Sequence, residues 1–439
     1  MANTRTDILD TIEHIDNAAM KQNLTTALWE FARERGTPRI EKQSADDYEA
    51  TFLYQSNDPS LHLTLKSEDL YDRMLDKDGK LREFTHIPDT DIYYLKVSNI
   101  PSKVCVEYAI LSHEHQISDA LNKNNAIIKR FDATSNSIIS KKACYLKTDD
   151  ADIPRLISND EHYEISKKRF HSEKTTFTDR DIYLYKPENF DPKTGKVVFM
   201  LDGKEFCELM APYLSAAAKN TAYVFVDSST TECSEPGGYE YKTFNYKPFD
   251  FPDEKRLDFK DRIYEFYFKK ADFAQMLANE LLPQYCETLG ITNKDNVILA
   301  AHSLAAHPVL EIASKRSSDI GGVILISPAI NKNLPDSLPD KPDERLGSLP
   351  IYMQVGQLEN IEPSQAVADK TDTCAISLLA ANNTFHTRLR SARYTIDNLN
   401  VHSGGHAGIH AMQGLKKGLN FIDEHKPVSV VTHSHRVNK

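Results

Sequence analysis

Residues 297–313 read VILAAHSLAAHPVLEIA, an apolar run, a short turn and a helical pattern in immediate succession. The apolar run of residues 297–300 predicts a short buried strand, and the spacing of apolar residues from Ala305 to Ala313 predicts a helix. Ser303 lies between the two. A serine at a sharp strand-to-helix turn has an exposed hydroxyl, and the helix N-terminus beside it can stabilise a developing negative charge. This stretch therefore predicts that Ser303 is a nucleophile.

The flanks of this serine depart from the usual pattern of such turns, which is Gly-x-Ser-x-Gly. Both glycine positions hold alanine here, Ala301 and Ala305. The Cβ of alanine is expected to crowd a turn that normally has bare backbone, which weakens the pattern. A serine before a helix is also typical of an N-cap, so this second interpretation of Ser303 stays open on the stretch alone.

Two later segments supply the partners that such a nucleophile needs. Residues 349–356 read as a buried strand and a turn, and Glu359 follows three residues later. Residues 394–401 alternate like a strand and lead into Gly404-Gly405-His406. In α/β-hydrolases the nucleophile, the acid and the histidine follow one another in this order along the chain. The order therefore favours an acyl-transfer site.

In such a site His406 takes the serine proton, while Glu359 orients the imidazole ring and stabilises its charged form. Taken singly, a surface-loop histidine and a solvated carboxylate are the simpler interpretations, and the ordered set favours the catalytic one. Glu362 and Asp369 are nearby alternatives for the acid.

Length and composition limit the number of domains, the partners and the cellular location that we expect. A chain of 439 residues is too long for one ordinary core, so two domains are expected. The formal net charge of −11 argues against nucleic acid or an anionic membrane as the main partner. No apolar run approaches the roughly 18 residues of a membrane span, and residues 1–23 lack the pattern of a secretory signal. We therefore expect a cytoplasmic protein, whose scattered cysteines are reduced thiols.

The pattern of segments changes along the chain. Residues 8–35 are helical in pattern, and short alternating segments such as 92–97 then predict a β-sandwich. Residues 136–160 are polar and are expected to form a linker. Strands and helices alternate beyond it, which predicts a mostly parallel sheet covered on both faces. We therefore expect a helix and sandwich domain over residues 1–150 and a catalytic domain over residues 161–427.

Along nearly its whole length, the chain resembles the enterochelin (enterobactin) esterases, which hydrolyse ferric catecholate siderophores. The resemblance rests on an ordered set of short motifs. They are Gly36-Thr37-Pro38, Leu201-Asp202-Gly203, the Arg-x-x-Glu of Arg262 and Glu265, the Gly-x-x-Glu of Gly356 and Glu359, and Gly404-Gly405-His406.

The resemblance implies an α/β fold, with an N-terminal immunoglobulin-like β-sandwich and a C-terminal α/β-hydrolase domain. It implies roles for the nucleophile, base and acid named above. We expect no cofactor. We also expect no bound metal ion, because Gly404 and Gly405 interrupt any helix that would place His402, His406 and His410 on one face. Backbone N–H groups of Leu304 and Lys204 would form the oxyanion hole. Asp202 and Arg262 would bind substrate, with the alternatives that Asp202 is a turn residue and Arg262 a surface partner of Glu265.

Three functions are compatible with these features. The first is cytoplasmic hydrolysis of the ester bonds of a ferric siderophore, the second is hydrolysis of another small acyl ester, and the third is ligand binding without turnover. The family has aromatic residues after its Gly-Gly-His, whereas this chain has Ala407 to His410, which puts the substrate in question. Because every implied catalytic residue follows residue 200, we expect the N-terminal domain to shape substrate choice and not catalysis.

Overall fold

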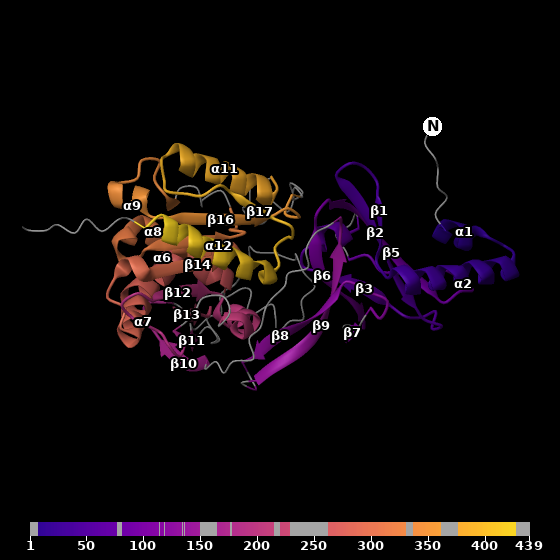
Figure 1. The fold of residues 1–439 in the computed structure, drawn as a ribbon, viewed down its shortest axis with the longest axis horizontal. Helices are drawn as coiled ribbons and strands as arrows, with labels where there is room; N and C mark the ends of the chain where they lie inside the picture. The colour runs from indigo at the N-terminus through magenta and orange to yellow at the C-terminus, as the bar shows by residue number, and fades with distance from the viewer. Residues whose placement is uncertain are drawn as a thin grey trace, which may run out of the picture. The chain divides into compact units, whose positions relative to one another are not determined.

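The computed structural model describes residues 8–76, 81–113, 115–117, 119–133, 135, 137–149, 165–175, 178–214, 220–228, 262–330, 337–360 and 376–426. The chain divides into two compact units. Within the described residues, the first unit contains those up to 149 together with two later stretches, 356–360 and 401–410. The second unit contains the rest (Figure 1).

The first unit begins with two helices and continues as two antiparallel sheets. The helices are α1 (Ile8–His14) and α2 (Ala18–Arg35). One sheet has the order β1 (Arg39–Lys42), β2 (Asp47–Gln55), β5 (Ile92–Pro101) and β4 (Thr85–His86). The other has the order β3 (Leu63–Lys66), β6 (Cys105–Ser112), β9 (Ser137–Lys147) and β8 (Asn125–Asp132), with β7 (His115–Ile117) beside β6. The short helix η1 (Tyr71–Met74) follows β3.

A shared hydrophobic core joins these two sheets. It receives Phe52 and Leu95 from the first sheet and Val106 and Ile110 from the second, all buried. Along β6 the buried side chains alternate with partly exposed ones, as in a strand with one face on a core. The predicted β-sandwich is confirmed.

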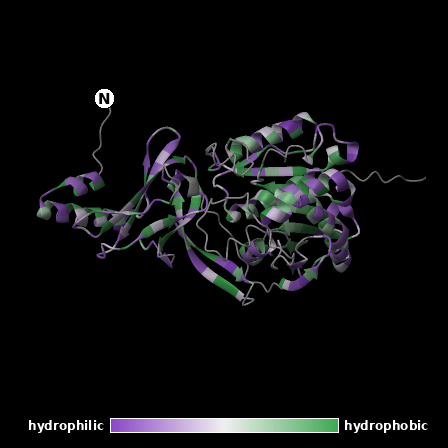
Figure 2. Cartoon of the chain, turned by 180° about the vertical axis from the view of Figure 1, so that it is seen from behind, coloured by the Kyte–Doolittle hydropathy of each residue, from purple (hydrophilic) through white to green (hydrophobic). Residues whose placement is uncertain are grey.

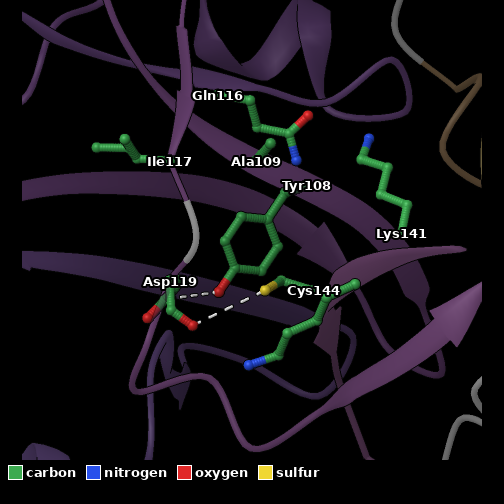
Figure 3. A pocket seen from close by; sticks show the side chains of 8 residues that line it. Tyr108, Ala109, Gln116, Ile117, Asp119, Lys141 and Cys144 are labelled. Atoms are coloured by element: carbon green, nitrogen blue, oxygen red, sulfur yellow. Dashed lines mark hydrogen bonds between the residues drawn. The ribbon is translucent and has the colours of Figure 1, made fainter.

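The sandwich contains a hollow of about 260 Å³ over β6, β7 and β9 (Figure 3). Asp119 lies in its wall, and the Asp119 carboxylate accepts hydrogen bonds from the hydroxyls of Tyr108, at 2.6 Å, and Thr37, at 2.8 Å. Protein donors thus already bind this carboxylate. We assign the hollow no functional role.

The second unit contains an eight-stranded sheet. Its order is β10 (Ile165–His171), β11 (Asp179–Tyr185), β13 (Thr221–Val226), β12 (Lys196–Leu201), β14 (Val297–His302), β15 (Gly322–Ile326), β16 (Ile351–Gly356) and β17 (Asn400–His402). The strands from β13 to β16 are parallel, and β10 and β11 are antiparallel additions. Parallel strands end at a common edge, so the residues that follow β12, β14, β15 and β16 lie along one edge of this sheet.

Helices cover both faces of this sheet (Figure 1). The helices described in the unit are α3 (Gly203–Met210), η2 (Ala211–Tyr213), the π-helical η3 (Tyr264–Phe268), α6 (Lys270–Met276), the π-helical η4 (Leu277–Leu281), α7 (Leu282–Leu289), η5 (Lys294–Asn296), η6 (Ser303–Ala305), α8 (Ala306–Arg316), η7 (Ser317–Asp319), α9 (Glu344–Ser348), α11 (Leu378–Ser391) and α12 (Ala411–Glu424). Buried residues of α6, α7, α8 and α11 form one core with the strands, and α12 packs Ile422 against Gly322 of β15. Hydrophobic residues run along the central strands in Figure 2. The predicted α/β fold class is confirmed.

Three sequence expectations differ from the structure. The predicted helix over residues 8–35 is divided, because Asn17 accepts a hydrogen bond from the Met20 N–H and caps a second helix. The predicted linker over residues 136–160 is wrong where β9 lies, and residues 150–160 lie outside the described residues. The predicted strand over residues 394–401 is wrong for most of its length, because β17 spans only Asn400–His402.

A buried ion pair ties η3 to the sheet. Arg180 on β11 donates to both oxygens of Glu265, at 3.0 and 2.8 Å, and both side chains are almost fully buried. A fork-to-fork pair of this kind fixes orientation as well as position. The glutamate of the Arg-x-x-Glu motif is therefore a buried anchor.

Removing one member of this pair should be far more damaging than removing both. Arg180→Met or Glu265→Leu leaves a buried charge without its partner and should cost about 3–5 kcal/mol of unfolding free energy. The double variant should regain most of that loss, measured by urea unfolding of the two single variants and the double variant. Losses that simply add would contradict a direct pair.

Candidate active site

The backbone turns sharply at Ser303. β14 ends at His302 in an extended conformation, Ser303 has a φ of 56°, and the helical residues of η6 and α8 follow. A left-handed backbone is uncommon for a residue other than glycine and is typical of a strained functional turn. The Ser303 carbonyl accepts a hydrogen bond from the Ala329 N–H at 2.9 Å, which holds the turn. The strand, the turn and the helix occur where the sequence predicts them.

The two alanines that flank this serine, each two positions away, do not have a left-handed backbone conformation. Ala305 has a φ of −62° and a ψ of −12°, which is helical, and Ala301 lies within β14. Both are buried. The crowding expected from their Cβ atoms therefore imposes no unusual backbone geometry, since Ser303 alone takes the strained conformation.

The segment after β12 is tied to the end of β14. Asp202 has a φ of 60°, and its carboxylate accepts two hydrogen bonds from Arg262, at 2.6 and 2.8 Å. The same guanidinium donates to the His302 carbonyl at 3.4 Å. Arg262 is thus not a surface partner of Glu265, and it braces the residue before Ser303.

The two backbone N–H groups expected in the oxyanion hole have different surroundings. Leu304 is the second residue of η6, and its side chain packs against the hydrophobic core. The Lys204 N–H donates to the carboxylate of Asp227 at 3.3 Å. Asp227 follows β13 and was not expected from the sequence.

The Asp227 carboxyl has an unusual proton affinity. Burial raises the pKa of Asp227 to about 7, the Lys204 N–H partly offsets this, and the charges of Asp202 and Asp181 raise it further. At neutral pH the group beside the Lys204 N–H is therefore poised between its neutral and charged forms.

The predicted acid and base meet within the first unit. The ring nitrogen Nδ1 of His406 lies 2.5 Å from Oε1 of Glu359, and the other carboxylate oxygen accepts the Gly356 N–H at 2.5 Å. The Glu359 side chain is 5% exposed, whereas that of His406 is 33% exposed, so the imidazole keeps an open side. This is the hydrogen bond by which a carboxylate orients a catalytic histidine. The alternatives Glu362 and Asp369 lie outside the described residues.

A second buried pair lies beside the first. His410 Nε2 is 3.1 Å from the Asp69 carboxylate, and the rings of His402 and His410 are stacked with centroids 4.5 Å apart. Burial alone lowers the pKa of His410, but the Asp69 carboxylate more than offsets this and the pKa is raised. No local pattern points to Asp69, because it lies 336 or more positions from its partners along the chain.

Comparison with solved structures relates the whole chain to known proteins. The ferric enterobactin esterase from Salmonella typhimurium aligns with a TM-score of 0.61 at 15% identity, over 91% of this chain and 98% of that one. An enterobactin esterase from Shigella flexneri, solved in the presence of enterobactin, aligns with a TM-score of 0.60 at 15% identity, over 90% and 97% of the two chains. The chain has the fold of the enterobactin esterases. It is an α/β-hydrolase fold with an N-terminal domain, as the sequence resemblance implied.

Other comparisons add nothing to this finding. No protein-family model matches the chain, and no curated protein matches it. Among the described residues, no helix combines the length and apolar character needed to cross a membrane.

The Asp227 carboxyl should make stability depend on pH. Its pKa of about 7 is raised above the ordinary value near 3.9, so the folded state binds this proton more tightly than the unfolded state. The stabilisation is complete below about pH 4 and is lost as the pH rises to about 7. Asp227→Asn keeps an acceptor for the Lys204 N–H but removes this dependence. Urea unfolding at pH 5 and pH 8 should show a smaller loss in the variant than in the unaltered protein, and equal losses would contradict the assignment.

Proposed function

We propose that the protein is a serine ester hydrolase in which Ser303, His406 and Glu359 form the catalytic triad. The observation that carries the proposal is the hydrogen bond between His406 and Glu359, together with a left-handed serine at the end of β14. Chain order supports it, since the nucleophile, the acid and the histidine follow β14, β16 and β17 in the order found in α/β-hydrolases.

The proposed reaction is a two-step acyl transfer. The Ser303 oxygen attacks the ester carbonyl carbon while His406 takes the serine proton, and Glu359 stabilises the imidazolium. The tetrahedral intermediate then expels the alcohol, which receives its proton from His406. Water, activated by the same histidine, attacks the acyl-enzyme and releases the acid.

The developing oxyanion needs preorganised donors, and Leu304 and Lys204 are the proposed ones. Leu304 follows the nucleophile directly at the start of a helix, where backbone N–H groups have no intrahelical partner. The Lys204 N–H bond to Asp227 is long, at 3.3 Å, so a bound oxyanion can compete for this donor. Each such donor is worth about 3 kcal/mol of barrier. In this proposal Asp202 and Arg262 bind the substrate, and the contact of Arg262 with the His302 carbonyl holds the turn before Ser303.

The proposed substrate is a ferric siderophore of the catecholate type, whose ester bonds are cut in the cytoplasm so that iron is released. The likeness to enterobactin esterases covers about nine-tenths of this chain and so includes the N-terminal domain. The Shigella flexneri esterase was solved in the presence of enterobactin and, in a separate structure, in the presence of 2,3-di-hydroxy-N-benzoyl-serine.

A different acyl ester is the second candidate. Ala407, Gly408 and Ile409 follow the catalytic histidine, where the enterochelin esterase pattern has aromatic residues. Aromatic side chains are natural partners for flat catechol rings, and their loss favours a smaller or less aromatic substrate.

A serine-directed phosphonate should distinguish a catalytic Ser303 from an ordinary one. Mass spectrometry should find one adduct, on the peptide that contains Ser303, because His406 activates this hydroxyl in the proposed triad. The adduct should be absent in Ser303→Ala and His406→Ala. Ser327→Ala is the matched control, since Ser327 also has a left-handed backbone, with a φ of 43°, at the end of the neighbouring strand.

Glu359→Gln should lower the rate of ester hydrolysis, measured as kcat for p-nitrophenyl acetate. The amide keeps the shape of the side chain but cannot stabilise the imidazolium, so hydrolysis should fall about 10³–10⁴-fold with the fold intact. A large loss in Glu362→Gln or Asp369→Asn instead would show that the acid is misplaced. In the labelling experiment, an adduct on another residue would reject Ser303 as the nucleophile, and no adduct in the unaltered protein would favour ligand binding without turnover.

Turnover of a matched set of esters should separate the two substrate classes. If the substrate is a catecholate siderophore, kcat/KM for a ferric tricatecholate triester should exceed that for p-nitrophenyl acetate by orders of magnitude, because remote contacts lower the barrier. The iron-free triester is the control for recognition of the metal complex. A preference for the small ester would favour the second candidate.

A further inference from the structure

The loops that carry the acid and the base are built into the first unit. The acid loop is residues 356–360 and the histidine loop is residues 401–410. They are joined by hydrogen bonds from the Gln357 N–H to the His402 carbonyl and from the Leu358 N–H to the Gly404 carbonyl, both 2.9 Å. The two loops therefore form one body.

Asp69 holds the histidine loop on both sides of His406. Its oxygen Oδ1 accepts the N–H of Gly405 at 3.1 Å and that of Ala407 at 2.8 Å, and its other oxygen contacts His410. The Asp69 side chain is 1% exposed. One buried carboxylate from the turn after β3 thus fixes the residue before and the residue after the proposed base.

Arg73 holds the acid loop in the same manner. Its guanidinium donates to the carbonyl of Leu358 at 3.0 Å and to the side chain of Asn360 at 2.6 Å, which are the residues before and after Glu359. Its Nε donates to the Asn99 carbonyl on β5 at 2.8 Å, so the arginine is itself anchored in the sandwich. The Leu358 side chain also belongs to the sandwich core.

The glycines before His406 are explained by these contacts. A Cβ on Gly405 would lie 2.8 Å from Oδ1 of Asp69, and a Cβ on Gly404 would overlap the ring of His410. The Gly-Gly-His motif therefore allows the loop to approach a buried acid and its histidine partner closely.

Burying these charged groups is costly, and sandwich packing alone needs neither of them. A buried carboxylate or guanidinium loses several kcal/mol of hydration unless it is fully paired, and apolar residues usually fill such positions at lower cost. Here the charges are used to donate to, or accept from, the four residues that flank the acid and the base. An active site in which the acid and the base must be held in fixed positions explains this arrangement.

We infer that Asp69 and Arg73 are positioning residues for the Glu359–His406 pair, so that the N-terminal domain completes the catalytic machinery. The inference rests on the proposed hydrolase function. It revises the expectation that this domain shapes substrate choice alone, because the residues that orient the acid and base loops precede residue 150.

Asp69→Ala and Asp69→Asn test the inference in the full chain. Alanine removes the acceptor for both backbone N–H groups, and a displacement of about 1 Å at His406 should lower kcat for p-nitrophenyl acetate about 100-fold with little change in KM. Asparagine keeps an oxygen acceptor in the same place and should recover most of that loss. Arg73→Lys, which keeps the charge but cannot hold Leu358 and Asn360 together, should also lower kcat.

Asp119→Ala is the matched control. Asp119 is also a buried carboxylate of the first unit, and it accepts the backbone N–H groups of Leu121 at 3.0 Å and Asn122 at 3.1 Å, away from both loops. This variant should lose stability in urea unfolding while the folded protein keeps its kcat. A folded Asp69→Ala protein with unaltered kcat, or an equal loss of kcat in Asp119→Ala, would overturn the inference.

Hydrogen exchange gives a readout that does not depend on activity. Peptides covering residues 401–410 should take up deuterium faster in Asp69→Ala than in the unaltered protein or in Asp119→Ala, because the Gly405 and Ala407 N–H groups lose their acceptor. Unchanged exchange would reject the positioning role. If the unaltered protein neither hydrolyses esters nor reacts with the phosphonate, the proposed function fails while exchange still decides whether Asp69 orders the loop. If Asp69→Ala does not fold, Arg73→Lys supplies the comparison, with kcat and the exchange of peptides covering residues 356–360 as the readouts.

Discussion

Three neighbouring parallel strands of the second unit each end in a left-handed residue, and the candidate groups of this unit depend on that constraint. Asp202 after β12, Ser303 after β14 and Ser327 after β15 have φ values of 60°, 56° and 43°. Each such residue costs roughly 1–2 kcal/mol when it is not glycine, so the surroundings must hold it. Arg262 joins Asp202 to the His302 carbonyl, the Ala329 N–H binds the Ser303 carbonyl, and the Ser327 N–H binds the Gln354 carbonyl on β16. A neighbouring segment thus holds each turn. Ser303 therefore lies at a rigid edge of the eight-stranded sheet.

The fold and the proposed nucleophile could be predicted from sequence because their signals are local. An apolar run, a turn and a helical pattern within 17 residues identify the β14–α8 junction, since each element depends mainly on its own residues. The short β17 could not be placed in the same way. Its preceding segment alternates like a strand, but apart from one bridge between Ile351 and Ile396 it does not pair, and pairing depends on another segment of the chain.

Ion pairs between distant segments could not be predicted from the sequence. Arg262 and Glu265 are three positions apart, which suggests that they bind each other on a helix. In the structure they bind Asp202 and Arg180, which are 60 and 85 positions away. The motif therefore marks two separate anchors for one helical segment. Asp69 and Arg73 are the same case in the first unit, where neither residue has a local pattern that points to the acid or histidine loop.

The positions of glycine and alanine show where the space beside the backbone is limited by neighbouring side chains and where it is not. The chain has only 16 glycines in 439 residues, and alanine stands at both turn positions beside Ser303. That substitution is tolerated because Ala305 is helical and Ala301 is within a strand, where a Cβ is ordinary. Gly404 and Gly405 differ, since a Cβ at either would meet His410 or Asp69 at less than contact distance. Glycine thus stands where a buried acid must reach the backbone on either side of the histidine, whereas the turn at the proposed nucleophile accommodates alanine.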